Sequence, residues 1–198
     1  MPLRKNCLQT ALKSDKIMKL DVPYYSQFLD VDDKYWMPRA CGIVALKMVL
    51  DFYLPASKAG KKDIPPIMEL INSCEKAGGY GKSGWFHDAL VSLAKSFGFE
   101  SSRKEKMDTD IGTEEIVGHL KEGRPVLISA VKYILGQTKF HMVVVIGFEE
   151  KNGVLTGIYY HDPEAIDRLK GQHIFVDVNT FKREWRKMAI FVSPPARA

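Results

Sequence analysis

The chain has 198 residues, of which 45% are hydrophobic and 27% charged. This balance excludes a disordered chain, and the length suits one hydrophobic core rather than several domains. The net charge of +5 comes from lysines and arginines scattered along the chain, so no nucleic-acid partner is expected, although the charge would favour acidic partners.

The first 18 residues show no clear periodicity and predict a loose arm or a short helix, which precedes one domain over residues 19–198. Residues 1–20 contain no apolar run of signal-peptide length, and the longest later run, 142–148, is too short to span a bilayer. We therefore expect a cytoplasmic protein without a membrane span, and export remains an alternative if a signal has been trimmed.

The segment 20–25 contains Pro23 and predicts extended backbone at an edge. An acidic loop follows, and its three aspartates, Asp30, Asp32 and Asp33, lack the glycine and the distal glutamate of a calcium-binding loop. We expect these three side chains to be solvated.

Apolar residues lie almost all round a helix from Cys41 to Tyr53, which predicts a buried helix that ends before Pro55 and Gly60. Glycine, proline or threonine marks the ends of three further predicted helices. These span residues 64–77, residues 88–97, and residues 113–121 with Thr113 as the N-cap.

The second half of the chain is rich in β-branched and aromatic runs that are separated by turn signals, such as Asn152-Gly153. The runs predict an antiparallel sheet, with one short helix over 179–185 between the last two strands. The predicted strands are 125–131, 141–148, 154–160, 174–178 and 188–192. Helices followed by strands predict an α+β fold with the site where the two halves meet.

Cys41 stands in the first turn of its predicted helix. A thiol becomes a strong nucleophile as the thiolate, which a helix N-terminus or a neighbouring imidazolium favours. An unpaired cysteine is otherwise a small buried hydrophobic residue, which is our interpretation of Cys7 and Cys74. Three cysteines do not suggest a disulfide framework; a reducing compartment or a free thiol fits better.

His141 opens a strongly apolar strand, where an imidazole needs a hydrogen-bond partner. Asp162 follows 21 positions later at the end of the next strand, and a hairpin would place the two side by side. A carboxylate there would hold the imidazole so that its other nitrogen faces a thiol. The alternatives are a structural histidine and an aspartate that only starts a turn.

Gln27 lies 14 residues before Cys41, on the loop after the extended segment. A side-chain amide in this position could join the Cys41 backbone N–H in stabilising a tetrahedral oxyanion. A surface glutamine is the alternative.

Four short motifs occur in the order Tyr-Ser-Gln, Ala-Cys-Gly, His-Met-Val-Val-Val-Ile-Gly and His-Asp-Pro. A further segment, 84–90, opens a helix ahead of Phe97-Gly98-Phe99. Together they resemble the bacterial bacteriocin-processing peptidases of the papain-like clan, and especially the stand-alone relatives of these enzymes. The resemblance runs from about Val22 to Trp185.

The resemblance implies a papain-like α+β fold, with an N-terminal helical half packed on a C-terminal antiparallel sheet. It also implies hydrolysis of a peptide or protein substrate through an acyl-enzyme, without a metal or organic cofactor. By position, Cys41 would be the nucleophile, His141 the base, Asp162 the residue that orients it, and Gln27 the oxyanion donor. The chain departs from the family at Ile43, where relatives often have proline, and it has no attached transporter, so export-coupled cleavage of double-glycine leaders is not expected.

The remaining histidines are not expected to act in catalysis. His161 adjoins Asp162 but would point to the opposite face of a regular strand, so we expect a surface group or a supporting neighbour. The other three lack partners at metal-ligand spacing, and zinc is not expected; they are His87, His119 and His173. Large aromatic residues could line a substrate groove or fill the core; they are Tyr25, Trp36, Trp85 and Trp185.

Two alternatives to a peptidase remain on the same scaffold. Water or an amine can resolve a thioester, so deamidation or transpeptidation would use the same residues. An inactive peptide-binding module would keep only the fold. The sequence does not indicate an oligomeric state.

Overall fold

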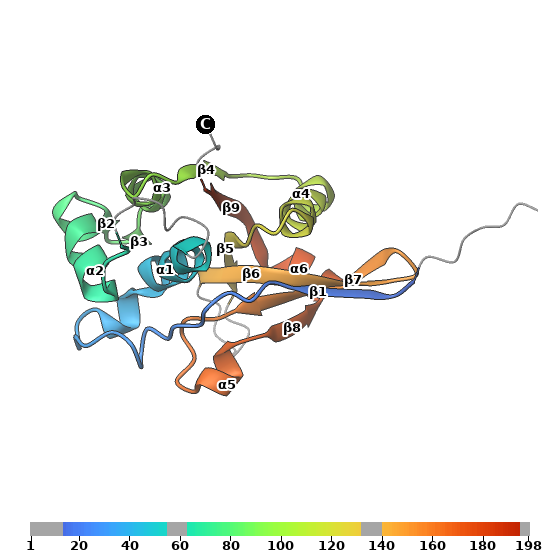
Figure 1. The fold of residues 1–198 in the computed structure, drawn as a ribbon, viewed down its shortest axis with the longest axis horizontal. Helices are drawn as coiled ribbons and strands as arrows, with labels where there is room; N and C mark the ends of the chain where they lie inside the picture. Colours follow the sequence, from blue (N-terminus) through green and yellow to red (C-terminus); the bar gives the residue numbers. More distant parts are fainter. Residues whose placement is uncertain (1–13, 55–62, 132–139, 195–198) are drawn as a thin grey trace, which may run out of the picture.

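The computed structural model describes residues 14–54, 63–131 and 140–194. The predicted arm up to residue 13, with Cys7, and the predicted helix stop at Pro55 and Gly60 lie outside these ranges. Within them the chain folds as helices and one large antiparallel sheet, so the predicted α+β class is confirmed (Figure 1).

The sheet has seven strands within the described residues, in the order β4-β9-β5-β6-β7-β8, with β1 added beside β6. β6 is long enough to pair with β5 over its first half and with β1 over its second half, while β7 lies along its other edge. The strands are β1 (Lys16–Lys19), β4 (Glu100–Lys104), β5 (Val126–Val131), β6 (Phe140–Lys151), β7 (Val154–His161), β8 (Ile174–Asp177) and β9 (Trp185–Ser193).

The central strands are buried on both faces because their side chains alternate between two apolar clusters. Along β6, Val144 and Ile146 belong to the first cluster, whereas Val143 and Val145 belong to the second. The sequence of a strand that is buried on both faces is a nearly continuous apolar run, and β6 shows this pattern.

The first cluster joins the sheet to the N-terminal helices, which pack on one face of it (Figure 1). These are the 3-10 helix η1 (Met37–Arg39), α1 (Cys41–Tyr53), α2 (Ile67–Lys76) and α3 (His87–Ser96), with the short hairpin of β2 (Tyr80–Gly81) and β3 (Gly84–Trp85) between the last two. The predicted arrangement of a helical half packed on a sheet is confirmed.

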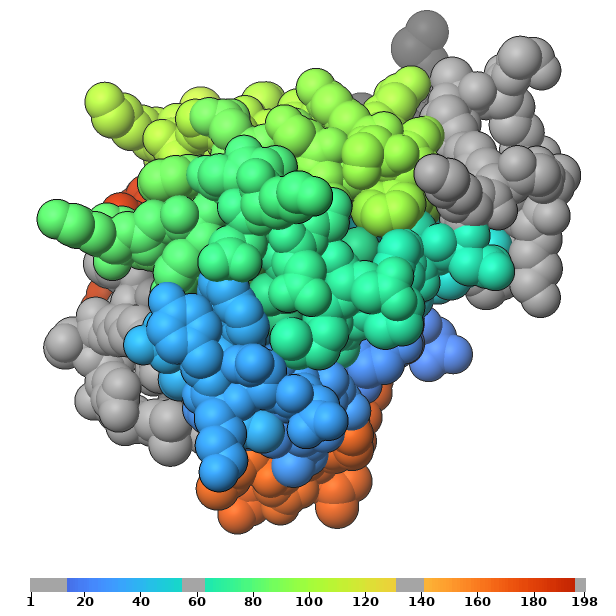
Figure 2. Space-filling view, turned by 90° about the vertical axis from the view of Figure 1, so that its left-hand side faces the viewer, coloured from blue at the N-terminus to red at the C-terminus, as the bar shows by residue number. Residues whose placement is uncertain are grey.

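The second cluster covers the other face, where α4 (Thr109–Lys121) and α6 (Val178–Glu184) pack on the sheet. The short helix α5 (Arg168–Gly171) follows the loop after β7. A space-filling view shows the blue segment before α1 between the green residues of the α2 region and the orange residues of the α5 region (Figure 2). Asp30 in the segment before α1 and Arg168 in α5 join these two segments through a bidentate ion pair.

Three expectations about local structure were wrong or incomplete. α4 begins at Thr109, because Asp108 caps it by accepting from the backbone N–H groups of Asp110 and Ile111; Thr113 lies inside the helix. β4 was not predicted, because an edge strand that buries only Ser101 looks polar in sequence. Asp30 is not simply solvated, because Arg168 holds it.

β1 places residues 16–18, the end of the predicted arm, in the sheet, so an arm over all of residues 1–18 was wrong at its C-terminal end. The strand approaches β6 closely at Gly147, where an added Cβ would overlap the carbonyl oxygen of Met18. The domain boundary itself stays a prediction. No helix among the described residues is both long and apolar enough to cross a membrane.

Candidate active site

A cleft of about 570 Å³ opens between the helical half and the sheet. Its walls include Cys41 from α1, His141 and Met142 from β6, Ser129 from β5, and Trp85 from β3. The structure therefore brings together residues 100 positions apart in the chain at the junction of the two halves.

Cys41 is the first residue of α1 and is only partly buried. The N-cap residue Ala40 has no side chain that could accept from the first-turn N–H groups, and the first intrahelical bond runs from the Val44 N–H to the Ala40 carbonyl. The N–H groups of the first helical turn have no intrahelical acceptors. The thiol thus lies beside backbone donors that are available to an anionic group.

His141 lies between the Cys41 thiol and the Asp162 carboxylate. Its Nε2 is 3.3 Å from Asp162 Oδ1, and both His141 and Cys41 line the same cleft. Among the described residues, neither ring nitrogen of His141 makes a well-formed hydrogen bond. Loose geometry of this kind is common in unliganded active sites, where hydrogen bonds tighten when substrate binds.

The surroundings of His141 favour its charged form. The ring is 4% exposed, and this burial alone would lower its pKa. Hydrogen bonding and charge from Asp162 and Cys41 outweigh the burial and raise the pKa of His141 above its ordinary value. The surroundings are therefore suited to an imidazolium at His141.

Asp162 is held by several backbone contacts as well as by its own side chain. The Tyr24 hydroxyl donates to the Asp162 carbonyl at 2.9 Å, and the Asp162 N–H donates to the Gly171 carbonyl at 2.7 Å. The Glu164 N–H donates to Asp162 Oδ1 at 2.7 Å, which closes an Asx turn. A side chain at Gly171 would overlap the Tyr24 hydroxyl, so a glycine is required beside this anchor.

Gln27 is buried, with 1% of its surface exposed, so it is not a surface glutamine. Its backbone N–H donates to the Pro163 carbonyl at 2.7 Å, which fixes it to the loop that carries Asp162. The adjacent Ser26 hydroxyl donates to the Ala165 carbonyl at 2.6 Å. The amide oxygen of Gln27 has no hydrogen-bond partner within the described part of the chain.

Comparison with protein families matches residues 19–190 to the model of the Peptidase_C39 like family. The chain belongs to the Peptidase_C39-like family. No curated protein matches the chain. The match spans almost all of the described fold, so the family resemblance drawn from the four motifs is confirmed.

Solved structures share this fold. A Bacillus anthracis protein described as a C39-like peptidase is 19% identical with a TM-score of 0.65, over 92% of this chain and 100% of that one. The double glycine motif protease of an AMS/PCAT transporter, solved with its leader peptide, is 17% identical with a TM-score of 0.58, over 89% and 94%. The peptidase domain of Streptococcus ComA, a bifunctional ABC transporter involved in quorum sensing, is 22% identical with a TM-score of 0.55, over 79% and 93%. The papain-like fold of this family member is thereby confirmed.

Glu164 is a residue of the site that sequence reasoning missed. Its carboxylate oxygen lies 3.5 Å from His141 Nδ1, and the residue is 8% exposed. In the hairpin of this family member Val144 pairs with His161, so the same register continued past the strand ends would place His141 opposite Glu164. The available signal was a second carboxylate two residues after Asp162 in the Asp-Pro-Glu sequence.

Of the two alternatives that the sequence left for His161, the surface group was wrong. His161 is completely buried; Nε2 lies 3.0 Å from the Val22 carbonyl, and Nδ1 accepts from the His173 N–H. Burial lowers the pKa of His161 to about 4, so the ring is neutral and ties the segment before α1 to the end of β7. Its role in this family member is structural.

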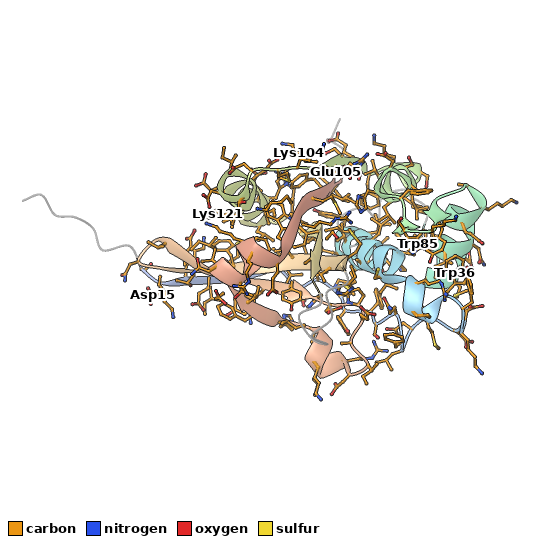
Figure 3. The ribbon with its side chains drawn as sticks, turned by 180° about the vertical axis from the view of Figure 1, so that it is seen from behind. Asp15, Trp36, Trp85, Lys104, Glu105 and Lys121 are labelled. Atoms are coloured by element: carbon orange, nitrogen blue, oxygen red, sulfur yellow. The ribbon has the colours of Figure 1, made fainter. Side chains whose placement is uncertain are left out.

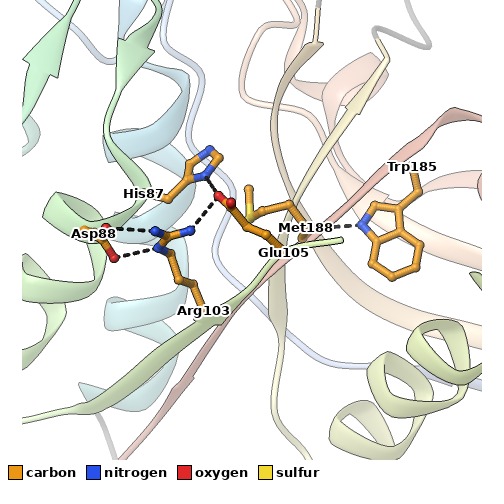
Figure 4. A network of polar contacts seen from close by, with 6 residues as sticks. All are labelled: His87, Asp88, Arg103, Glu105, Trp185 and Met188. Carbon is orange, nitrogen blue, oxygen red and sulfur yellow. Dashed lines mark hydrogen bonds and ion pairs between the residues drawn. The ribbon is translucent and has the colours of Figure 1, made fainter. Parts of the chain in front are cut away.

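The aromatic residues divide between cleft and core. Trp85 lines the cleft and stacks on Trp36, which lies behind it, and the two rings are seen together in Figure 3. The Trp85 indole N–H donates to the Arg39 carbonyl at 2.7 Å, which anchors the backbone just before Cys41. Trp185 is a core residue whose indole donates to the Met188 carbonyl (Figure 4). Tyr25 packs against the first apolar cluster, and its hydroxyl donates to Asp51.

Proposed function

We propose that the chain is a cysteine peptidase that cleaves a peptide or amide bond through a thioester on Cys41. The observation that carries this proposal is that Cys41 and His141 line one cleft, with the Asp162 carboxylate buried 3.3 Å from the His141 ring. Membership of the Peptidase_C39-like family supports cysteine peptidase activity as the chemistry of the site.

In the proposed reaction the Cys41 thiolate attacks the substrate carbonyl carbon, and the charge moves to the carbonyl oxygen. The Cys41 backbone N–H and the Gln27 amide donate to that oxygen. The C–N bond then breaks as His141 gives its proton to the departing amine, which leaves the thioester. Water then attacks the thioester carbonyl and gives a proton to the neutral His141. The C–S bond breaks, the carboxylic acid product leaves, and the thiolate and imidazolium are restored. Asp162 holds the ring throughout.

The reactivity of the thiols distinguishes an active cysteine peptidase from an inactive binding module. Iodoacetamide at pH 6 is expected to label Cys41 at least about tenfold faster than Cys74, because only the thiolate reacts. Burial raises the pKa of Cys74 to about 11, which makes it an internal control. Mass spectrometry of the labelled peptides measures each cysteine separately, including Cys7. Equal slow labelling of all three would favour the binding module.

The pH profile of kcat/KM tests the partners of His141. The raised pKa of His141 is expected to place the alkaline limb, where the imidazolium loses its proton, above the ordinary imidazole range. Asp162→Asn should move this limb to lower pH, because the amide lacks the charge that stabilises the imidazolium. Asparagine keeps an acceptor for the Glu164 N–H, so the loop is preserved.

Glu164→Gln should move the same limb in the same direction but less far, since the carboxylate is farther from the ring than that of Asp162. An alkaline limb that stays in place in both variants would show that His141 is not the titrating group.

A further inference from the structure

The cleft beside Cys41 is lined by cationic side chains that come from three distant segments. Arg39 ends η1 two residues before Cys41, Lys82 lies in the turn between β2 and β3, and Arg186 is the second residue of β9. His87, at the start of α3, adds a fourth group that becomes cationic when protonated. The fold, not the local sequence, gathers these charges at one opening.

No carboxylate lines the cleft among the described residues. The carboxylates of Asp88 and Glu105, next to the lining residue His87 in the sequence and in space respectively, are both paired with cations (Figure 4). Arg103 binds Asp88 with two hydrogen bonds and Glu105 at 2.6 Å, and His87 lies 3.1 Å from Glu105. Arg186 also acts on Glu105.

The residues that line and surround the opening of the cleft therefore carry an excess of positive charge. Arg39, Lys82 and Arg186 line the cleft, and Arg103 of the neighbouring strand is a fourth cation, against the two carboxylates of Asp88 and Glu105. The carboxylates of Asp162 and Glu164 do not line the cleft and are buried against His141.

Arg39 is held in place beside the nucleophile. Its guanidinium lies 4.3 Å from the centroid of the Tyr35 ring and donates to the Tyr35 carbonyl at 2.6 Å. Such contacts limit the rotamers of the side chain, so less entropy is lost when a carboxylate binds to it. An arginine fixed in this way can still offer its remaining N–H groups to an anion.

We propose that this cleft receives an acidic stretch of the substrate, so that peptides with Asp or Glu close to the scissile bond are favoured. The inference rests on the proposed function only in calling the bound peptide a substrate, because an acidic peptide can bind to the cleft without being cleaved. The net charge of +5 would also steer acidic peptides towards the molecule.

Binding is measured on the Cys41→Ala variant, so that the result does not depend on catalysis. The probes are a fluorescein-labelled peptide of alternating glycine and glutamate and its counterpart with glutamine in place of glutamate. Fluorescence anisotropy is expected to show about tenfold tighter binding of the acidic peptide at low salt, from several exposed ion pairs acting together. The difference should shrink as salt is added.

The residues are assigned with matched variants on the Cys41→Ala background. Arg39→Gln combined with Arg186→Gln should remove most of the preference, whereas Lys170→Gln on α5, which does not line the cleft, should keep it. Equal binding of the two peptides, or a preference that survives the double substitution, would overturn the inference.

A separate measurement tests the proposed function independently of the preference for acidic peptides. Wild-type protein is incubated with peptides from a digested proteome, and mass spectrometry reads the sites of cleavage. Cleavage enriched for Asp or Glu beside the cut supports the inference and the function together. Cleavage without that enrichment overturns the inference and keeps the function, whereas acidic binding without any cleavage overturns the function and keeps the inference.

Discussion

Replacement of Cys41 by alanine is expected to abolish peptide hydrolysis while the protein remains folded. Removal of a nucleophile commonly lowers kcat by roughly 10⁵-fold or more, because the remaining groups cannot form the covalent intermediate. The thiol is only partly buried and alanine is the best helix former, so α1 should persist. Hydrolysis of a fluorogenic peptide gives the rate, and thermal unfolding followed by circular dichroism reports the fold.

His141→Gln should have an effect of similar size, because the two residues act as one unit. Glutamine preserves much of the volume in a site where two carboxylates approach the ring, which reduces the risk that the variant fails to fold. Cys74→Ala is the matched control, since Cys74 is buried between α2 and its neighbours and lines no part of the catalytic cleft. Full activity in both Cys41→Ala and His141→Gln would refute the triad.

Replacement of Gln27 by alanine is expected to lower kcat by about 10²- to 10³-fold, which is the usual cost of one oxyanion donor. KM should change much less, because the amide would contact the oxygen most strongly when it carries charge. Gln27 is already buried and its backbone N–H is bonded to the loop of Asp162, so little movement of the residue would be needed at the moment of reaction. Steady-state kinetics separate the two parameters.

Two control variants distinguish a role of Gln27 in the reaction from an effect on the folded structure. Gln27→Asn retains an amide but withdraws it by one methylene, so it should lose most of the same rate while disturbing the packing less. Gln172→Ala, just after α5, should leave kcat unchanged. A large increase in KM with kcat preserved would indicate that Gln27 binds substrate rather than stabilises the oxyanion.

Local sequence signals predicted the elements whose burial pattern is regular. The helix from Cys41 to Tyr53 was predicted at its observed bounds, because its apolar residues surround the axis and leave no competing interpretation. The hairpin of β6 and β7 followed from the Asn152-Gly153 turn, where both residues adopt positive φ. β4 and the first turn of α4 were missed, because polar segments with one buried side chain carry almost no periodic signal.

The sequence by itself determined the α+β class, the family and the order of the residues that compose the candidate site, because these depend on periodicity, turn chemistry and motif spacing. Only the tertiary structure decided that Glu164 reaches the His141 ring. It also decided that His161 is buried, neutral and joins two segments of the backbone. The same holds for the cleft that Arg39, Lys82 and Arg186 share. The reason is physical. A side chain's neighbours across the fold depend on strand register and helix packing, which bring distant segments together and leave no mark in the local sequence.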